Sequence, residues 1–436
     1  MINLNGKYTN ATIMNDRVEA DTISQIVGMI NNKSFQNNVV IMPDVHEGKG
    51  AVIGFTMSLG NQIVPNVVGV DIACQMLAYR VERDALNDID MDSFDRDLRS
   101  RIPMGKTVKD QPLNIKSGNW YEDYNFNWSA IQKACSSFVN AYNKRFGVSF
   151  SIPDMNYTWF EALCKKVGVD KTYAEASIGT LGGGNHFIEV GIDEEEYLWV
   201  TVHSGSRNLG SRTAIYWQNR ACDNVKAKDR SKVINNIKDN YPKSEWQTRI
   251  SELKNDGQTK GLECLEGKDM FEYLVDSLFL YYYAGVSVRC MMGETLMLLN
   301  YPDFITSVHT VHNYVSHHDF IIRKGAVASY KDYQIIVPFN MEDGLVICEG
   351  KSNPDWNFSA PHGAGRVMGR AEAKKSLKAE MVLDIQKRML SKGILSKSLP
   401  VDELKEAYKD PTEILSYSHP TMEVIHTVKP IIGFKE

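Results

Sequence analysis

The sequence predicts a mixed α+β protein, one large domain over residues 1–436 in which sheets surround a deep cleft. Three observations predict this. Short apolar runs typical of buried strands recur along the chain. Several of these runs lead into polar or glycine-rich loops, where binding residues commonly lie. A charged and mostly helical stretch from about 213 to 300 interrupts them, and we interpret it as a helical insertion between two halves of the site.

The composition is that of an ordinary globular protein, with 43% hydrophobic and 24% charged residues. The net charge of −5 gives no global sign of nucleic-acid binding, so an anionic partner would need a local basic cleft. Seven scattered cysteines argue against a secreted disulfide framework. No apolar run reaches membrane-spanning length, and the N-terminus lacks a signal-peptide segment. We therefore expect a soluble, monomeric, cytoplasmic protein.

The first elements expected are a helix over 21–33 and strands over 38–42 and 51–56. Between the strands lies the polar and glycine-rich segment 43–50, which predicts a loop. Asp44 and His46 alternate along it, so both side chains are expected on one side. Taken alone, such a segment is usually explained by a turn with a capped aspartate.

A further strand is expected at Val67–Val70, ending in Asp71, and Cys74 follows three residues later. A thiolate and a carboxylate placed close together can hold a divalent metal, and the sulfur can bridge two ions. The alternative is a buried structural cysteine, the commonest fate of a free thiol.

After two helices expected over about 125–168, the glycine-rich stretch 179–189 precedes a strand that begins at Phe187. Its glycines let the backbone approach a ligand closely, and successive amides can cradle phosphate oxygens. Asn185, His186 and Glu189 add an amide, an imidazole and a carboxylate. This set suits a nucleotide beside a metal ion, although a tight turn with a structural histidine remains an alternative.

The strand expected at 198–202 also ends in a histidine, His203, and a glycine/serine loop follows with Arg207. Further along, four histidines lie close together, and His312 followed by Asn313 is the ligand candidate among them.

Two basic or histidine-containing motifs follow in the last third of the chain. Arg323 and Lys324 beside a glycine form either a phosphate contact or a solvated basic turn. Paired strands are expected over 334–349. The motif His362–Arg366 then opens a helix expected over 367–389, and a helix N-terminus favours anions. A histidine there could attack a phosphorus centre, whereas the alternative is a capping turn with a surface histidine.

Together the candidate ligands form a mixed set large enough for two divalent ions: Asp71, Cys74, His186, His203 and His312. From these residues alone the sequence predicts a dinuclear metal enzyme that acts on phosphate esters.

The motifs resemble the RtcB family of RNA ligases along nearly the whole chain. The most specific are the blocks Gly179-Thr-Leu-Gly-Gly-Gly-Asn-His-Phe-Ile-Glu189 and His362-Gly-Ala-Gly-Arg366. The others are Pro43-Asp-Val-His-Glu-Gly-Lys-Gly-Ala-Val-Ile-Gly54, Val-Gly-Val-Asp71-Ile-Ala-Cys74, Val-His203-Ser-Gly-Ser-Arg, His312-Asn and Arg323-Lys-Gly-Ala. The two specific blocks both occur, and in the family's order, which argues against coincidence.

The resemblance implies an RtcB-like fold and an enzyme that uses GTP and two Mn²⁺ ions. Such an enzyme joins an RNA 3′-phosphate or 2′,3′-cyclic phosphate to a 5′-hydroxyl, in RNA repair or tRNA splicing. His362 would attack the α-phosphorus of GTP and carry GMP, which then passes to the RNA 3′-phosphate. An archease-like activator is a further partner that the resemblance suggests.

The resemblance also implies a role for each candidate residue. Cys74 would bridge the two metals, with Asp71, His203 and His312 completing one site and His186 serving the other. The residues implied for the nucleotide pocket are Asn185, Phe187, Glu189, Gly363, Gly365, Arg366, Tyr417 and Lys435. Tyr417 would stack on the base and Lys435 would contact guanine. Arg207, Arg323 and Lys324 would hold RNA or triphosphate phosphates.

Several positions depart from the family pattern and indicate a divergent bacterial or phage branch. Ala73 and Gln75 stand where the family usually has glycines around the cysteine, and Glu47 replaces a common proline. The segment Phe339–Asp343 replaces a Gly-Ser-Met-Gly block, and the chain ends Lys-Glu instead of Lys-Gly. None of these changes removes a proposed ligand or the nucleophile.

Two other functions compete with the ligase. A dinuclear phosphodiesterase or phosphatase would use the same metals without guanylylation of His362. An RNA-end-binding factor without turnover would need no nucleophile, and the acidic net charge also disfavours it.

Overall fold

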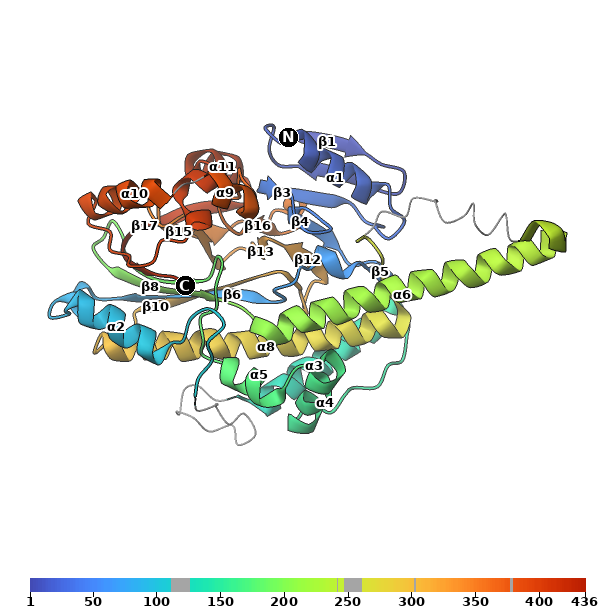
Figure 1. The fold of residues 1–436 in the computed structure, drawn as a ribbon, viewed down its shortest axis with the longest axis horizontal. Coiled ribbons are helices and arrows are strands. Elements are labelled where there is room, and N and C mark those ends of the chain that lie inside the picture. The colour runs from blue at the N-terminus through green and yellow to red at the C-terminus, as the bar shows by residue number, and fades with distance from the viewer. Residues whose placement is uncertain (111–125, 241, 247–260, 302, 377–378) are drawn as a thin grey trace.

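The computed structural model describes residues 1–110, 126–240, 242–246, 261–301, 303–376 and 379–436. Two large sheets and the helices around them make up the fold (Figure 1), so the α+β class is confirmed. The first sheet has the strand order β1-β2-β3-β4-β12-β11. Its strands are β1 (Ile2–Asn5), β2 (Asn10–Ile13), β3 (Val39–His46), β4 (Ile53–Ser58), β11 (Tyr314–Val315) and β12 (Ile321–Lys324).

Helix α1 (Ala20–Ile30) lies between β2 and β3, and those two strands are parallel. Parallel neighbours need a crossover of this kind. The expected helix over 21–33 is thus confirmed. The expected loop at 43–50 begins too early, because β3 continues to His46. The pairing of β3 with β4 shifts register between Ile41 and His46. Pro43 lies within this irregular stretch, where the backbone N–H that proline lacks is not needed for the ladder.

The second sheet has seven strands in the order β10-β6-β8-β7-β17-β15-β14. Their bounds are β6 (Cys74–Val81), β7 (Phe187–Ile192), β8 (Leu198–Ser204), β10 (Thr306–His312), β14 (Gln334–Pro338), β15 (Leu345–Gly350) and β17 (Met422–Phe434). All neighbouring pairs are antiparallel. The strands expected at 187–191, 198–202 and 334–349 are confirmed.

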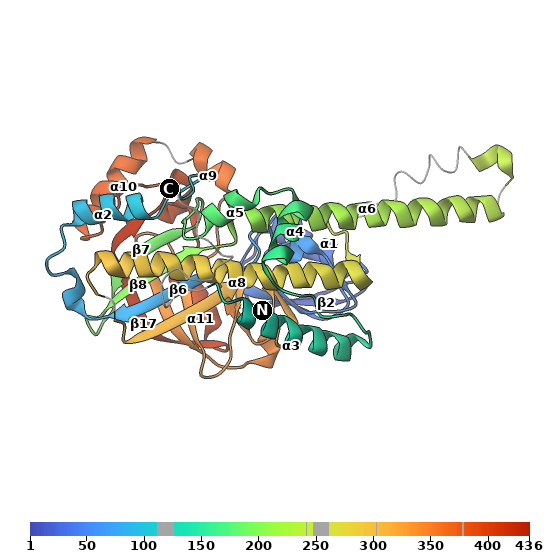
Figure 2. The same ribbon diagram turned by 90° about the horizontal axis from the view of Figure 1, so that it is seen from below.

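Helix α8 (Gly267–Leu298) packs against β8 and β6 on one face of this sheet, as Figure 2 shows. The side chains of α8 are buried on nearly all sides of the helix, as expected of a core helix. Phe279, Tyr283 and Met291 are examples. Helix α6 (Arg207–Asn240) starts beside α8 and projects beyond the body of the molecule. The helical character of 213–300 is confirmed where it is described, and 241 and 247–260 lie outside the described residues. Its interpretation as an insertion in one domain stays a prediction.

The remaining helices are α2 (Met91–Arg101), α3 (Trp128–Phe146), α4 (Tyr157–Val167), α5 (Lys171–Ser177), α9 (Arg370–Ser376), α10 (Ala379–Ser391) and α11 (Pro411–Ser418). Helices α3 and α4 confirm the two expected over 125–168. The single helix expected over 367–389 is wrong at its start, because α9 begins only at Arg370, and residues 377–378 lie outside the described part.

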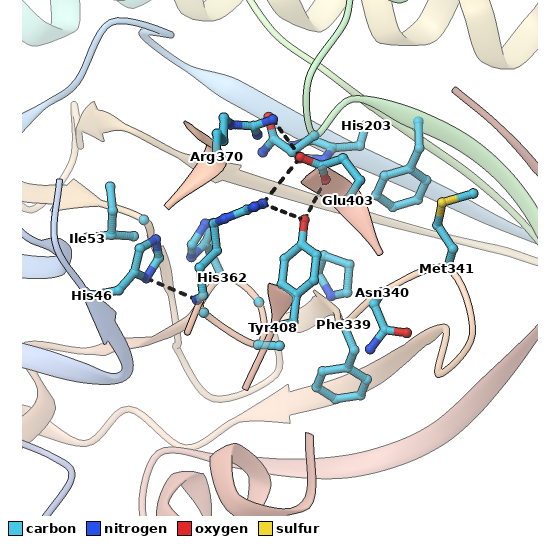
Figure 3. Close-up of a pocket in the computed structure, with 18 of the residues that line it drawn as sticks. His46, Ile53, His203, Phe339, Asn340, Met341, His362, Arg370, Glu403 and Tyr408 are labelled. Atoms are coloured by element: carbon cyan, nitrogen blue, oxygen red, sulfur yellow. Dashed lines mark hydrogen bonds and ion pairs between the residues drawn. The ribbon is translucent and has the colours of Figure 1, made fainter. Parts of the chain in front are cut away.

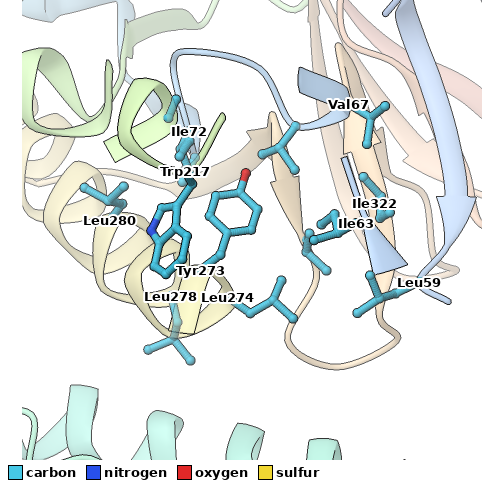
Figure 4. Close-up of a cluster of buried hydrophobic side chains, with 14 of the residues drawn as sticks. Leu59, Ile63, Val67, Ile72, Trp217, Tyr273, Leu274, Leu278, Leu280 and Ile322 are labelled. Carbon is cyan, nitrogen blue, oxygen red and sulfur yellow. The ribbon is translucent and has the colours of Figure 1, made fainter. Parts of the chain in front are cut away.

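The strand expected at Val67–Val70 is also wrong. Residues Pro65–Val67 form a short 3-10 helix, η1, because Pro65 fixes the backbone angle of a tight turn at its first position. The chain then turns through Gly69 and reaches β6 only at Cys74. Ile72, buried beside Trp217 and Tyr273 in the core of Figure 4, anchors this turn.

Two short ladders complete the sheet structure. Strands β5 (Gln62–Ile63) and β9 (Leu265–Glu266) form one, and β13 (Ala326–Ala328) and β16 (Ser359–Pro361) form the other. Because β13 follows β12 and pairs with β16, the second ladder places the loop at His362 close to the end of β12. Within the described residues, no helix is both long enough and apolar enough to cross a membrane.

Candidate metal and nucleotide site

Five potential metal ligands converge at one end of the second sheet. Cys74 opens β6, His203 lies near the end of β8, and His312 ends β10 directly opposite Cys74. The Cys74 Sγ atom lies 3.2 Å from Nε2 of His203 and 3.6 Å from Nε2 of His186. His186 Nε2 in turn lies 2.9 Å from Oδ2 of Asp71.

These ligands divide into two triads that share the thiol. One contains Cys74, His203 and His312, and the other contains Asp71, Cys74 and His186. Within each triad the ligand atoms all lie within 4.8 Å of one another. The structure therefore groups Asp71 with His186, whereas the resemblance implied that Asp71 would join His203 and His312.

Burial controls the protonation of this cluster. It raises the pKa of the Cys74 thiol well above its usual value, and the nearby Asp71 carboxylate raises it further. It lowers the pKa of His203 and His312 well below the usual value, so both imidazoles are neutral and suited to binding a metal. Nδ1 of His203 is buried and finds no hydrogen-bond partner in the part of the chain that the structure describes. This set of three imidazoles, one carboxylate and a central thiol fits two divalent cations bridged by a thiolate.

His362 lies in the loop that follows β16 and faces the same region. Its ring centroid lies 5.0 Å from that of His312. Its Nδ1 atom lies 2.7 Å from Oδ2 of Asp44, a completely buried residue of β3. An aspartate in that position accepts a hydrogen bond from Nδ1–H, which leaves Nε2 with the free lone pair. The expected helix N-terminus at His362 is absent, since α9 starts eight residues later, so the loop itself positions the ring.

Gly365 is required for this arrangement. Its φ is +75°, and a Cβ atom added there would lie 2.3 Å from the Asp44 carbonyl oxygen. The loop thus presses its backbone against the strand that carries Asp44.

A cavity of about 800 Å³ opens in front of His362, and Figure 3 shows part of its wall. It is bordered by both imidazoles of the first triad, His203 and His312. Seven of the residues expected in the nucleotide pocket line it: Asn185, Phe187, Glu189, Gly363, Gly365, Arg366 and Lys435.

Comparison with known proteins agrees with this geometry. Residues 25–436 match the family described as "tRNA-splicing ligase RtcB". The chain belongs to the RtcB family. It is 26% identical to the Escherichia coli K12 protein named "RNA-splicing ligase RtcB", over 96% of this chain and 95% of that one. It is 23% identical to the "tRNA-splicing ligase RtcB" of Nanoarchaeum equitans and 24% identical to that of Aeropyrum pernix, in each case over 94% of this chain and 90% of the relative.

Two buried groups mark one end of the cavity of this RtcB-family chain. Burial raises the pKa of Glu189 to about 8, and Lys435 partly opposes that rise. Oε1 of Glu189 is buried without a partner in the described structure. The Lys435 ammonium lies 5.8 Å from the centroid of the Phe187 ring. An unpaired carboxyl, a cation and an aromatic face together suit the edge and face of a polar base.

Tyr417 does not line the cavity. It lies in α11, and its hydroxyl bonds to Asp16. Tyr408 occupies the cavity wall instead, with its hydroxyl 2.5 Å from Glu403. Sequence reasoning missed Tyr408 and Glu403, because no pattern near either residue sets it apart.

The structure contradicts the phosphate contacts expected of Arg323 and Lys324, since both side chains are buried and fully engaged. The Arg323 guanidinium bonds to Asp319, Ser359 and the Phe358 carbonyl. The Lys324 ammonium bonds to three backbone carbonyls, those of Lys49, Ala51 and Asn66. Neither lines the cavity.

Arg207, in contrast, lines a second cavity of about 840 Å³. Asp71 and His186 of the second triad border it, and so do the cations Arg370 and Lys374. Asn185 lines both cavities. The metal ligands therefore lie where the two cavities meet.

Proposed function

We propose that this chain, an RNA ligase of the RtcB family, joins an RNA 3′-phosphate or 2′,3′-cyclic phosphate end to a 5′-hydroxyl end, with GTP as the co-substrate and two Mn²⁺ ions. The contact between Asp44 and His362 is the observation that carries this proposal. It provides an imidazole whose free lone pair lies at a nucleotide-sized cavity, beside a cluster suited to two metals.

The chemistry proposed for His362 is a nucleotidyl transfer. Nε2 attacks the α-phosphorus of GTP, an N–P bond forms, and the bond to the departing pyrophosphate breaks. Asp44 holds the proton on Nδ1 and stabilises the charge that the ring acquires. An oxygen of the RNA 3′-phosphate then attacks the same phosphorus and releases His362. The RNA 5′-hydroxyl finally attacks the activated 3′-phosphorus, and GMP leaves. A cyclic phosphate is opened by water beforehand.

Different residues of the two cavities would bind the metals, the base and the RNA phosphate. The five ligands of the two triads would hold the metals, which when bound neutralise phosphate charge and help align in-line attack. Glu189 and Lys435 would bind the base edge, and Phe187 would contact it. Arg207 would bind RNA phosphate in the second cavity.

A dinuclear phosphodiesterase is less well supported. It would use the same metal ligands, but it would give no role to the contact between the buried Asp44 and the half-buried His362. Buried free thiols such as Cys135, Cys164 and Cys348 are typical of proteins in a reducing compartment, which supports a cytoplasmic location. A monomeric state, an archease-like activator and the physiological RNA stay open predictions.

The deciding experiment is labelling of the protein with α-³²P-GTP and Mn²⁺, followed by a denaturing gel. We expect a labelled band for the wild type and for His318→Ala, a variant of an exposed histidine, and no band for His362→Ala. Wild-type protein that takes no label from GTP with Mn²⁺ would rule out the histidine intermediate and would favour the hydrolase.

A further inference from the structure

The buried carboxylate of Glu403 contacts four side chains in the wall of the main cavity, three through hydrogen bonds and Arg370 through an ion pair. Glu403 ends the short helix η6 (Val401–Glu403), and its side chain is 1% exposed. Three of its contacts are with the cations Lys435 (3.0 Å), Arg370 (2.6 Å) and Arg366 (3.3 Å), and the fourth is with the hydroxyl of Tyr408 (2.5 Å). Figure 3 shows Glu403 between Arg370 and Tyr408.

The contact with Lys435 connects this network to the base end of the cavity. Lys435 directly follows β17, which pairs with β7 so that Gly433 lies opposite Glu189. The ammonium group therefore projects beside Phe187 and Glu189, the residues that line this end.

Glu403 is the counter-ion of Lys435, with the carboxylate 3.0 Å from the ammonium nitrogen. The side chain of Lys435 is only 7% exposed, and burial lowers its pKa, whereas Glu403 opposes that change. Glu189 is a weak counter-ion, because its raised pKa keeps it largely protonated at pH 7. Asp402, the preceding residue, pairs with Arg370 and Lys374 instead.

We propose that Glu403 is a specificity-determining positioning residue, which holds Lys435 as an ammonium ion so that the site selects a 6-oxo purine over a 6-amino purine. An ammonium group can only donate hydrogen bonds. It therefore binds the O6 acceptor of guanine and is poorly matched to the N6 amino group of adenine, which also donates. A neutral amine could accept from that amino group, and selection would weaken. This inference rests on the proposed function, since it requires a purine nucleotide in this cavity.

The test compares the labelling of His362 by α-³²P-GTP and α-³²P-ATP, as kcat/KM for each nucleotide. In Glu403→Gln we expect the GTP-to-ATP ratio to fall at least tenfold, mainly through GTP. Asp402→Asn is the matched control: it removes a neighbouring carboxylate that also contacts Arg370 but not Lys435, so its ratio is expected to equal that of the wild type.

A double-mutant cycle that combines Glu403→Gln with Lys435→Met separates a role of Glu403 through Lys435 from a purely structural role. If Glu403 acts through Lys435, then Glu403→Gln changes the ratio little in the Lys435→Met background. Should Glu403→Gln fail to fold, Glu403→Asp retains the charge but withdraws it from the ammonium, and a smaller fall in the ratio is expected. If the folded Glu403→Gln variant loses kcat/KM equally for GTP and for ATP, the inference is overturned.

Failure of the inference is distinguishable from failure of the proposed function. A wild type labelled by GTP, with an unchanged ratio in Glu403→Gln, contradicts the inference alone. A wild type that takes no label overturns the proposed function and this inference with it. Calorimetric binding of guanosine and adenosine gives the same ratio without catalysis, and we expect the same order of variants.

Discussion

Nδ1 of His362 lies 2.7 Å from the carboxylate of Asp44, a residue 318 positions earlier in the chain. The other carboxylate oxygen, Oδ1, is buried and has no hydrogen-bond partner among the described residues. The hydrogen bond of Asp44 is therefore made to His362, and it fixes the tautomer in which Nε2 carries the lone pair.

Replacing Asp44 with asparagine should abolish most of the guanylylation. The asparagine amide can donate to Nδ1, which favours the tautomer with the proton on Nε2 and removes the nucleophile. We expect the rate of His362 labelling to fall about 10²-fold or more. Single-turnover labelling with α-³²P-GTP measures this rate, and circular dichroism verifies folding. A folded Asp44→Asn protein with the wild-type rate would show that the contact is dispensable.

The shared thiol predicts an unequal loss of metal from two variants. Cys74→Ala removes a ligand from both triads, whereas His312→Ala removes a ligand from one only. We expect bound Mn²⁺ to fall from two ions per chain to fewer than one in Cys74→Ala, and to about one in His312→Ala. Metal analysis after gel filtration gives the ratio. Equal losses in the two variants would mean that the sulfur does not bridge.

The sequence located most of the metal ligands because they stand next to strand signals: Cys74 opens β6, His186 directly precedes β7, and His203 and His312 lie at or near the ends of β8 and β10. Cys74, His203 and His312 could be chosen from local pattern alone, and antiparallel pairing then brings them together. Asp44 could not be assigned in the same way. Its partner is remote in sequence, and a turn with a capped aspartate is the usual explanation of the local pattern.

The errors in the site have the same cause. Arg323 and Lys324 stand beside a glycine and suggest a solvated or phosphate-binding turn, but residues from distant segments bury both. The tyrosine in the cavity wall is Tyr408 and not Tyr417. The chain has 20 tyrosines, and tertiary packing decides which one reaches the cavity.

Removing Arg323 should therefore affect stability and not RNA binding. Its side chain is completely buried and pairs with Asp319 at 2.9 Å. Arg323→Ala leaves that carboxylate and several acceptors unpaired, so we expect unfolding to become easier by about 3–5 kcal/mol. Urea denaturation measures the change. Arg207→Ala is the contrasting variant, for which we expect weaker RNA binding with stability changed much less. RNA affinity lost through Arg323 at unchanged stability would contradict this assignment.

Ala73 offers a stabilising substitution. Its φ of +57° lies in the left-handed region, which disfavours any residue with a Cβ atom. Ala73→Gly removes that strain but adds flexibility to the unfolded chain, so we expect a net gain of about 0.5 kcal/mol. Thermal unfolding measures it, with Ala78→Gly in β6 as a control that should destabilise. A loss of stability in Ala73→Gly would show that the turn is not strained.

Glu189 predicts how the affinity for guanine depends on pH. Burial raises the pKa of this carboxyl to about 8, so it carries a proton at pH 7. The N1–H and N2–H groups of guanine donate hydrogen bonds, and the ionised carboxylate is their better acceptor. Binding below pH 8 must then release that proton, so the affinity is expected to rise with pH, by up to tenfold per unit, and to level off near pH 8. Guanosine is the ligand of choice for calorimetry between pH 6 and 8, because it has no phosphate that titrates. Glu189→Gln should bind with an affinity that hardly changes over this range, and an equally steep rise in that variant would assign the dependence to another group.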